Sequence, residues 1–145
     1  TPSGNSVALL NIVRLGRMTG NLDLEKIAEQ IIKTFGETIN QHPSGYTQFM
    51  CALDFALGPT REIVIAGEPD QKDTKQILQE IGKRFLPKKV ILWHPSKDRS
   101  IEKIAQFIKE QLSIEGKATA YICENYACNA PTNDINKIIQ LLEGQ

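Results

Sequence analysis

Hydrophobic residues recur at helical spacing through the first 58 residues of the chain. The first stripe surrounds most of a helix that begins near Ser6 and ends at Gly20, and each of the next two stripes occupies one helix face. Short connections between the stripes predict antiparallel helices. The stripes are Val7, Ala8, Leu9, Leu10, Ile12, Val13, Leu15 and Met18; Leu24, Ile27, Ala28, Ile31, Ile32, Phe35 and Ile39; and Tyr46, Phe49, Met50, Leu53 and Leu57.

The first helix is apolar nearly all round, and such a helix is normally buried inside a larger body. We therefore expect a helix from a larger helical domain, with a central helix of this small domain as the alternative. The chain begins with Thr1, which fits a piece of a longer protein. Uncovered apolar surface becomes a contact site, so we expect packing against another chain or a symmetric homodimer through Val7, Leu10, Ile12 and Val13.

The pattern changes at Arg61, where short apolar runs alternate with helical stripes. The runs lie at residues 63–66, 90–93 and 118–123, and their β-branched residues predict buried strands. The stripes that follow them are Ile77, Leu78, Ile81 and Phe85; Ile101, Ile104, Ala105, Ile108 and Leu112; and Ile135, Ile138, Ile139 and Leu142. The candidate helix caps are Asp73, Ser100, and Thr132 or Asn133.

This alternation predicts a small sheet of three parallel strands near residues 62–66, 90–94 and 118–123, each followed by a helix. The expected fold class is therefore α/β. Antiparallel helices fill residues 1–58, and a three-stranded parallel β-α-β-α-β-α unit fills residues 59–145.

Composition narrows the function classes. The 145 residues carry 17 Lys+Arg and 17 Asp+Glu, and this zero net charge argues against a nucleic-acid partner. No apolar run approaches the roughly 20 residues of a membrane span, so we expect no membrane partner. The three cysteines, an odd number, argue against a disulfide-stapled secreted scaffold and favour the reducing cytoplasm.

Three motifs resemble a family of thioredoxin-domain-containing or spermatogenesis-associated proteins. They are Pro2–Ala8, Glu62–Gly67 and Ala120–Pro131, which are similar to that family's Pro-Ser-Gly-Asn-Ser segment, its strand ending in Gly, and its C-terminal Tyr, Cys, Asn, Cys and Pro signature. The resemblance covers this chain end to end and the last part of the family's length.

The resemblance implies a longer parent with an N-terminal thioredoxin-like domain, followed by a toroidal array of helical hairpins similar to sugar epimerases and six-hairpin glycosidases. This chain would hold the last helices of that α/α toroid and the terminal α/β segment. The family's activity is unsettled, so the resemblance implies architecture more than chemistry.

Cys123 and Cys128 are the candidate thiols. We favour a buried strand-end residue and a loop residue, because free cysteine is commonly buried and inert. A redox pair is the alternative, since a short loop can bring the two sulfurs together. Zinc is weaker, because Cys51, His42 and His94 offer no second paired ligand set. We expect no bound metal and no requirement for a disulfide.

The candidate ligand-facing residues lie at strand ends and at one helix start. Ligands of open parallel sheets bind outside the carboxyl ends of strands, which here carry Gly67, His94 and Asn125. Ser3, Asn5 and Ser6 precede or open a helix, where plain capping explains them. By the resemblance, they would contact a sugar-like substrate in the parent. The chain has no glycine-rich phosphate motif and no obvious pair of catalytic carboxylates in its helical part.

These observations favour a C-terminal structural fragment of unsettled activity that catalyses nothing by itself and holds no cofactor. Its expected partners are the rest of the parent chain and, through the first helix, a second copy. The alternatives are a thiol or redox module using Cys123 and Cys128, and part of a carbohydrate-type binding site in the parent.

Overall fold

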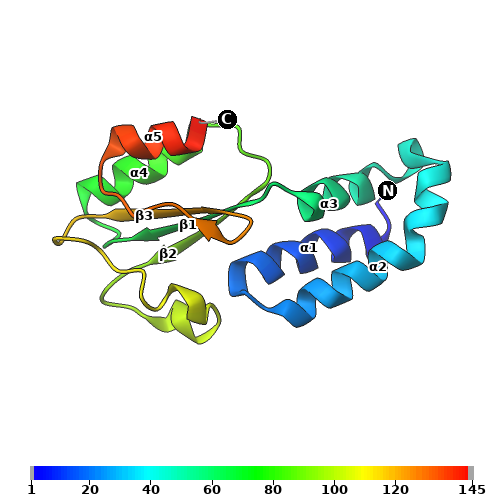
Figure 1. The fold of residues 1–145 in the computed structure, drawn as a ribbon, viewed down its shortest axis with the longest axis horizontal. Helices are drawn as coiled ribbons and strands as arrows, with labels where there is room; N and C mark the ends of the chain where they lie inside the picture. The colour runs from blue at the N-terminus through cyan, green and yellow to red at the C-terminus, as the bar shows by residue number, and fades with distance from the viewer. Residues whose placement is uncertain (1, 144–145) are drawn as a thin grey trace. The chain divides into compact units, whose positions relative to one another are not determined.

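The computed structural model describes residues 2–143. The chain divides into two compact units, Thr1–Thr60 and Arg61–Gln145, which are described separately below. The first unit is entirely helical, and the second is built around a sheet (Figure 1).

The helical unit holds α1 (Gly4–Thr19), α2 (Leu22–Gln41), the short 3₁₀ helix η1 (Pro43–Tyr46) and α3 (Thr47–Leu57). The first of these starts just before the expected position, because Ser3 Oγ accepts a hydrogen bond from the Ser6 N–H at 3.2 Å. It ends at Thr19, and the C-cap residue Gly20 has a φ of 67°, which suits glycine. Asn21 Oδ1 then caps α2 by accepting from the Asp23 N–H at 2.9 Å.

Packing in the helical unit centres on α1, which lies against both α2 and α3. Leu9 and Val13 of α1 are buried, as are Phe49 and Phe55 of α3. Of the 20 residues of α2, by contrast, only Ala28 and Ile39 are buried. The long middle helix therefore has far less cover than its neighbours.

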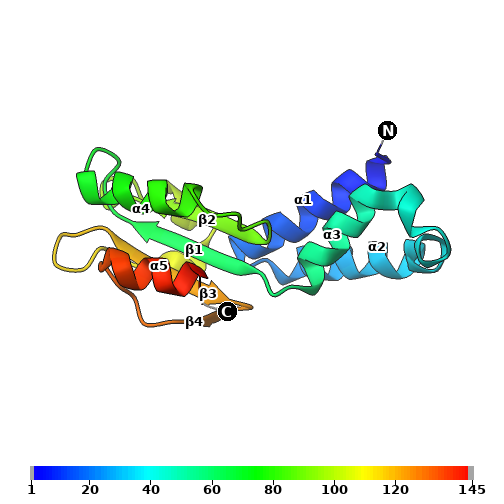
Figure 2. The ribbon, with the colours of Figure 1, turned by 90° about the horizontal axis from the view of Figure 1, so that it is seen from above.

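The second unit holds β1 (Arg61–Ala66), α4 (Lys72–Gly82), β2 (Lys89–His94), β3 (Thr119–Glu124), β4 (Ala127–Cys128) and α5 (Ile135–Glu143). The sheet order is β2-β1-β3-β4 (Figure 2). β1 and β2 are parallel, whereas β3 is antiparallel to β1 and β4 is antiparallel to β3.

The predicted class, helices followed by a small sheet with helices, is confirmed. The prediction of three parallel strands is wrong, because the sheet is mixed and has a fourth strand. Thr119, which opens β3, lies opposite Ala66, and Ala66 also lies opposite His94 at the end of β2. The connection after β2 therefore enters β3 at the same end of the sheet at which β2 finishes. As a result, β3 runs in the direction opposite to β1 and β2.

The helix predicted over residues 101–112 is also wrong. Two short 3₁₀ helices stand there, η2 (Ser100–Lys103) and η3 (Gln106–Ile108). Side chains hold the irregular backbone of this segment: His94 bonds to the Gln111 carbonyl and Arg99 to the Lys109 carbonyl. No side-chain cap bond comes from Ser100.

The other two predicted caps are wrong as well. Asp73 lies inside α4, and its Oδ2 accepts from the Ala118 N–H at 2.7 Å, which ties the helix to the start of β3. Asp134, rather than Thr132 or Asn133, accepts a first-turn N–H of α5, that of Asn136, at 2.9 Å.

The two faces of the sheet are covered differently. Figure 1 shows α4 and α5 on one side and the segment 95–117 on the other. On the side of α4 and α5, alternate side chains of β1 and β3 pack against both helices and form a hydrophobic core. They are Ile63, Ile65, Ala120 and Ile122, with Ile77, Ile81, Ile138 and Leu142 from the helices.

On the other face, Ala105 and Ile108 of the segment 95–117 are fully buried. Tyr121 Oη donates to the Leu112 carbonyl at 2.7 Å, which fixes the end of this segment. Among the helices of residues 2–143, none combines the length and the apolar character needed to cross a membrane.

Candidate functional site

The carboxyl ends of the strands lie at two opposite ends of the sheet. At one end, Gly67 follows β1 and His94 is the last residue of β2. Glu124, the last residue of β3, lies opposite Arg61, the first residue of β1, so Cys123 and Asn125 belong to the other end. The expectation that all these residues share one location is wrong, because it assumed that β3 runs parallel to β1.

A hollow of about 470 Å³ opens at the end of the sheet where β1 and β2 finish. It is lined by Glu68, Pro69, Asp70, Gln71, Trp93, Pro95, Lys97 and Asp98. Trp93 Nε1 donates to the Gly67 carbonyl at 2.8 Å. A side chain at Gly67 would place Cβ only 2.6 Å from Thr74 Oγ1, so this glycine is needed for close packing. The lining of this hollow contains carboxylates and one lysine, but no serine, threonine, cysteine or histidine that could act as a nucleophile.

His94 is buried in a polar network and does not line this hollow; its side chain is 1% exposed. Its Nδ1 lies 2.8 Å from the Gln111 carbonyl oxygen, and its Nε2 lies 2.8 Å from Glu102 Oε1. Arg99 Nε donates to the same carboxylate oxygen. His94 thus anchors the segment 95–117 to the end of β2.

Two opposing effects act on Glu102. Burial raises the pKa of the Glu102 carboxyl, but hydrogen bonds from His94 and Arg99 together outweigh burial, so the pKa lies below its usual value. The carboxylate therefore stays ionised and available as the acceptor for both side chains.

The opposite end of the sheet, where β3 finishes, carries a tight hairpin. Asn125 and Tyr126 connect β3 to β4 and have φ angles of 49° and 68°. Positive φ at both residues is the signature of a two-residue type I′ turn. Tyrosine rarely adopts this region, and the Tyr126 N–H is held by Glu62 Oε2 at 3.2 Å. Glu62 is only 3% exposed, so a buried carboxylate of β1 fixes the turn.

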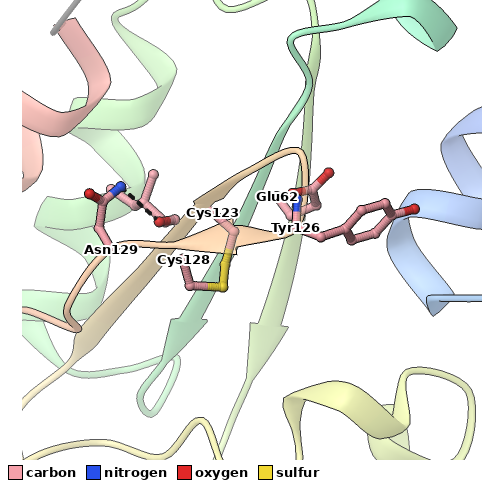
Figure 3. Close-up of a disulfide and its surroundings, with 6 residues drawn as sticks. Glu62, Cys123, Tyr126, Cys128 and Asn129 are labelled. Carbon is pink, nitrogen blue, oxygen red and sulfur yellow. Dashed lines mark hydrogen bonds between the residues drawn. A yellow bond between two sulfur atoms is a disulfide. The ribbon is translucent and has the colours of Figure 1, made fainter.

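Cys123 and Cys128 face each other across this hairpin and form a disulfide (Figure 3). The favoured interpretation is confirmed for the burial of Cys123 near the end of β3, and it is wrong in treating the two cysteines as free thiols. Cys123 is 4% exposed, whereas Cys128 is exposed at the edge of the sheet. Asn129 donates from its backbone N–H and from Nδ2 to the Ile122 carbonyl, at 3.0 and 3.2 Å. Cys51 is free and exposed on α3.

The remaining candidates lie in the helical unit. Ser3 Oγ and Ser6 Oγ are 2.7 Å apart, and Ser6 is buried. The two hydroxyls satisfy each other and cap α1, while Asn5 is exposed within the first turn. As for metals, residues 2–143 contain no group of three His, Cys, Asp or Glu side chains placed to hold an ion.

An open groove runs between α2 and α3, and the sequence did not indicate it. Its two hollows, of about 370 and 450 Å³, share Ile32 and Leu53. Val13, Ala28 and Ala56 line the first hollow, and Ile39, Phe49 and Met50 line the second. Glu25, Glu29, Lys33 and Glu37 contribute charged groups along the same groove.

Sequence reasoning also missed Glu62, Glu102 and Asn129. The charge of Glu62 directly before the apolar run 63–66 was a usable signal, because a buried carboxylate needs a donor. The other two gave no signal, since their partners depend on the path of the backbone.

Comparison with known proteins found relatives over nearly the whole chain. Spermatogenesis-associated protein 20 of Rattus norvegicus is 32% identical over 142 residues. The proteins of that name from Homo sapiens and Mus musculus are each 31% identical over 142 residues. In all three cases the match covers 97% of this chain and 18% of the relative, so the chain spans less than a fifth of their length. No family model matches the chain. No solved structure matches it either.

Proposed function

This chain and spermatogenesis-associated protein 20 belong to one family, and from that kinship we propose that the chain is the C-terminal structural part of a larger protein and catalyses nothing by itself. The helical unit is the docking surface for the rest of the parent. The α2–α3 groove is the observation that carries this proposal.

The groove has the character of an unfilled helix-packing site. Ile32 and Leu53 form its centre, and both are only half-buried. Of the seven apolar stripe positions on α2, only Ala28 and Ile39 are buried. An amphipathic face that its own unit covers only in part gains from a neighbour that excludes water.

The occupant that we propose is a helix from the preceding part of the parent. The relatives have more than four-fifths of their length outside the matched region. Under this proposal α1, α2 and α3 are the last helices of an α/α toroid that follows a thioredoxin-like domain. A second copy of the chain is the competing occupant.

We also place the parent in the cytoplasm. The exposed free Cys51 supports this, because an unpaired surface thiol suits a reducing compartment, whereas the Cys123–Cys128 disulfide counts against it. A carbohydrate-type role for Ser3 and Asn5 has less support, since Ser3 Oγ is already paired with Ser6.

The test is amide hydrogen exchange of α2 in the full-length parent and in this chain alone. We expect α2 to exchange more slowly in the parent, because the groove is covered there. Introducing Leu53→Lys into the parent should abolish that difference. Gln30→Lys, at an exposed polar position of the same unit, is the matched control and should preserve it.

Equal exchange of α2 in both proteins would contradict docking to the parent. Protection that instead rises with the concentration of the isolated chain, together with a dimer in sedimentation, would make the second copy the occupant.

A further inference from the structure

We propose that the Cys123–Cys128 pair is a thiol–disulfide exchange site that accepts low-molecular-weight thiols of the glutathione class, or a dithiol, at Cys128. This inference goes beyond the structural role of the helices, because it concerns the β3–β4 hairpin of the sheet unit. Three observations on the hairpin support it.

The first observation is the short span of the disulfide. The two cysteines are five positions apart and already lie opposite each other in the β3–β4 register. A cross-link stabilises a fold by restricting the unfolded chain, and this effect grows with loop length, so a bond over five positions contributes less than one that closes a long loop. The short span therefore lowers the thermodynamic cost of opening the bond.

The second observation is that other bonds hold the same hairpin. Glu62 Oε2 accepts the Tyr126 N–H at 3.2 Å on one side. On the other, Asn129 donates twice to the Ile122 carbonyl, at 3.0 and 3.2 Å. Figure 3 shows Glu62 and Tyr126 on one side of the two sulfurs and Asn129 on the other. The two thiols of a reduced hairpin would stay close, ready to re-form the bond.

The third observation is the unequal exposure of the two cysteines. Cys128 is exposed on a two-residue edge strand, while Cys123 is 4% exposed between β1 and β4. Cys128 is therefore the expected point of attack for a thiolate, and Cys123 the expected leaving group. Access of this kind is a main determinant of which sulfur reacts.

The exchange balances in two steps. A thiolate of the reductant attacks Cys128 Sγ, a mixed disulfide forms there, and Cys123 leaves as a thiolate that takes a proton from water. A second thiolate attacks the reductant's own sulfur in the mixed disulfide and releases Cys128, which is then protonated. Two reductant thiols become one disulfide, and the protein pair gains two electrons and two protons.

The first test counts free thiols in a Cys51→Ser variant of the chain, which removes the cysteine of the helical unit. After oxidation by air we expect no free thiols. Incubation with reduced glutathione or dithiothreitol, without denaturant, should expose two while the circular dichroism spectrum stays unchanged. Thiols that appear only in denaturant would overturn the proposal, as would two thiols that persist in oxidised glutathione.

The second test measures which cysteine reacts, and a structural staple predicts no such preference. Cys51→Ser/Cys123→Ser leaves Cys128 alone, and Cys51→Ser/Cys128→Ser leaves Cys123 alone. We expect oxidised glutathione to modify Cys128 at least ~10-fold faster than Cys123, because access governs the attack. Equal or reversed rates would overturn the assignment.

If either single-thiol variant fails to fold, the reduced Cys51→Ser protein supplies the same readout. Brief alkylation followed by peptide mass spectrometry should then label Cys128 before Cys123. Simultaneous labelling of both residues would contradict the proposed order of attack.

Discussion

The two units of the chain differ in how completely they cover their own apolar residues. In β1, every residue after Arg61 is buried, and helices or a long segment cover both sheet faces. In α2, only two of 20 residues are buried. The sheet unit therefore has the core of a self-sufficient fold, whereas the helical unit leaves most of its longest helix, α2, outside the core.

The largest expected effect lies in the core of the sheet unit. Ile65 is fully buried between the sheet and its two helices. Ile65→Ala should lower the free energy of unfolding by about 3–4 kcal/mol, because it leaves a cavity that neighbours cannot fill. Trp93, the single tryptophan, lies on β2, so its fluorescence during urea unfolding reports on this unit. Ile65→Val is the matched control and should lose only about 1 kcal/mol.

The next effect comes from the buried polar network of the same unit. His94→Ala removes the partner of the Gln111 carbonyl and one partner of Glu102. We expect a loss of about 2 kcal/mol in unfolding free energy, since a buried acceptor is left without a donor. Urea unfolding monitored by Trp93 again measures it. A loss no larger than that of an exposed substitution such as Lys109→Ala would contradict the anchoring role of His94.

The same network makes the sheet unit sensitive to acid. The pKa of Glu102 is lower in the folded than in the unfolded chain, because the hydrogen bonds from His94 and Arg99 outweigh burial. Its stabilisation is therefore fully present above the unfolded pKa, near 4.5, and is lost as the pH falls through the lowered folded value. Glu102→Gln should flatten this part of the stability profile measured between pH 7 and pH 3. An unchanged slope would show that other carboxylates govern it.

Sequence patterns predicted the elements of both units better than their arrangement. The β-branched runs located β1, β2 and β3, because a strand buried on both faces needs continuous apolar side chains. The direction of β3 was missed, since it depends on the path of the segment 95–117 and not on the residues of the strand. Helical spacing also predicted a false helix there, because Ala105 and Ile108, three residues apart, are buried anchors in a 3₁₀ geometry too.

The candidate site shows the same limit. The Ser3 cap followed from residue type and position alone, because its bond to the Ser6 N–H is local. The disulfide required knowledge that β4 pairs with β3 and that Cys128 lies opposite Cys123. The groove required knowledge that α1 packs against both other helices, which leaves the apolar face of α2 only partly covered. Contacts between distant residues are not encoded in periodicity.

A smaller effect is expected in the helical unit of the isolated chain. Ile32 is only half-buried in the groove, so Ile32→Ala should change the unfolding free energy by less than about 1 kcal/mol. Far-ultraviolet circular dichroism during urea unfolding measures the change. In the full-length parent the same substitution should be several times more damaging. An equally large loss in the isolated chain would mean that α2 is already well packed there, and the contrast between the two units would fail.

The smallest effect concerns a turn of the sheet unit. Glu115 and Gly116 have φ angles of 54° and 71°, and the Lys117 N–H bonds to the Ile114 carbonyl across them. Asparagine tolerates this region better than glutamate, and Asn-Gly is the preferred pair for such a two-residue turn. Glu115→Asn should therefore stabilise the unit by about 0.5 kcal/mol. Gly116→Ala is the opposing control and should destabilise it, since alanine is strained at positive φ. Both shifts should appear in the Trp93 signal and leave hydrogen exchange of α2 unchanged, because α2 belongs to the other compact unit. A change in α2 exchange of similar size would show that the sheet unit is not self-sufficient.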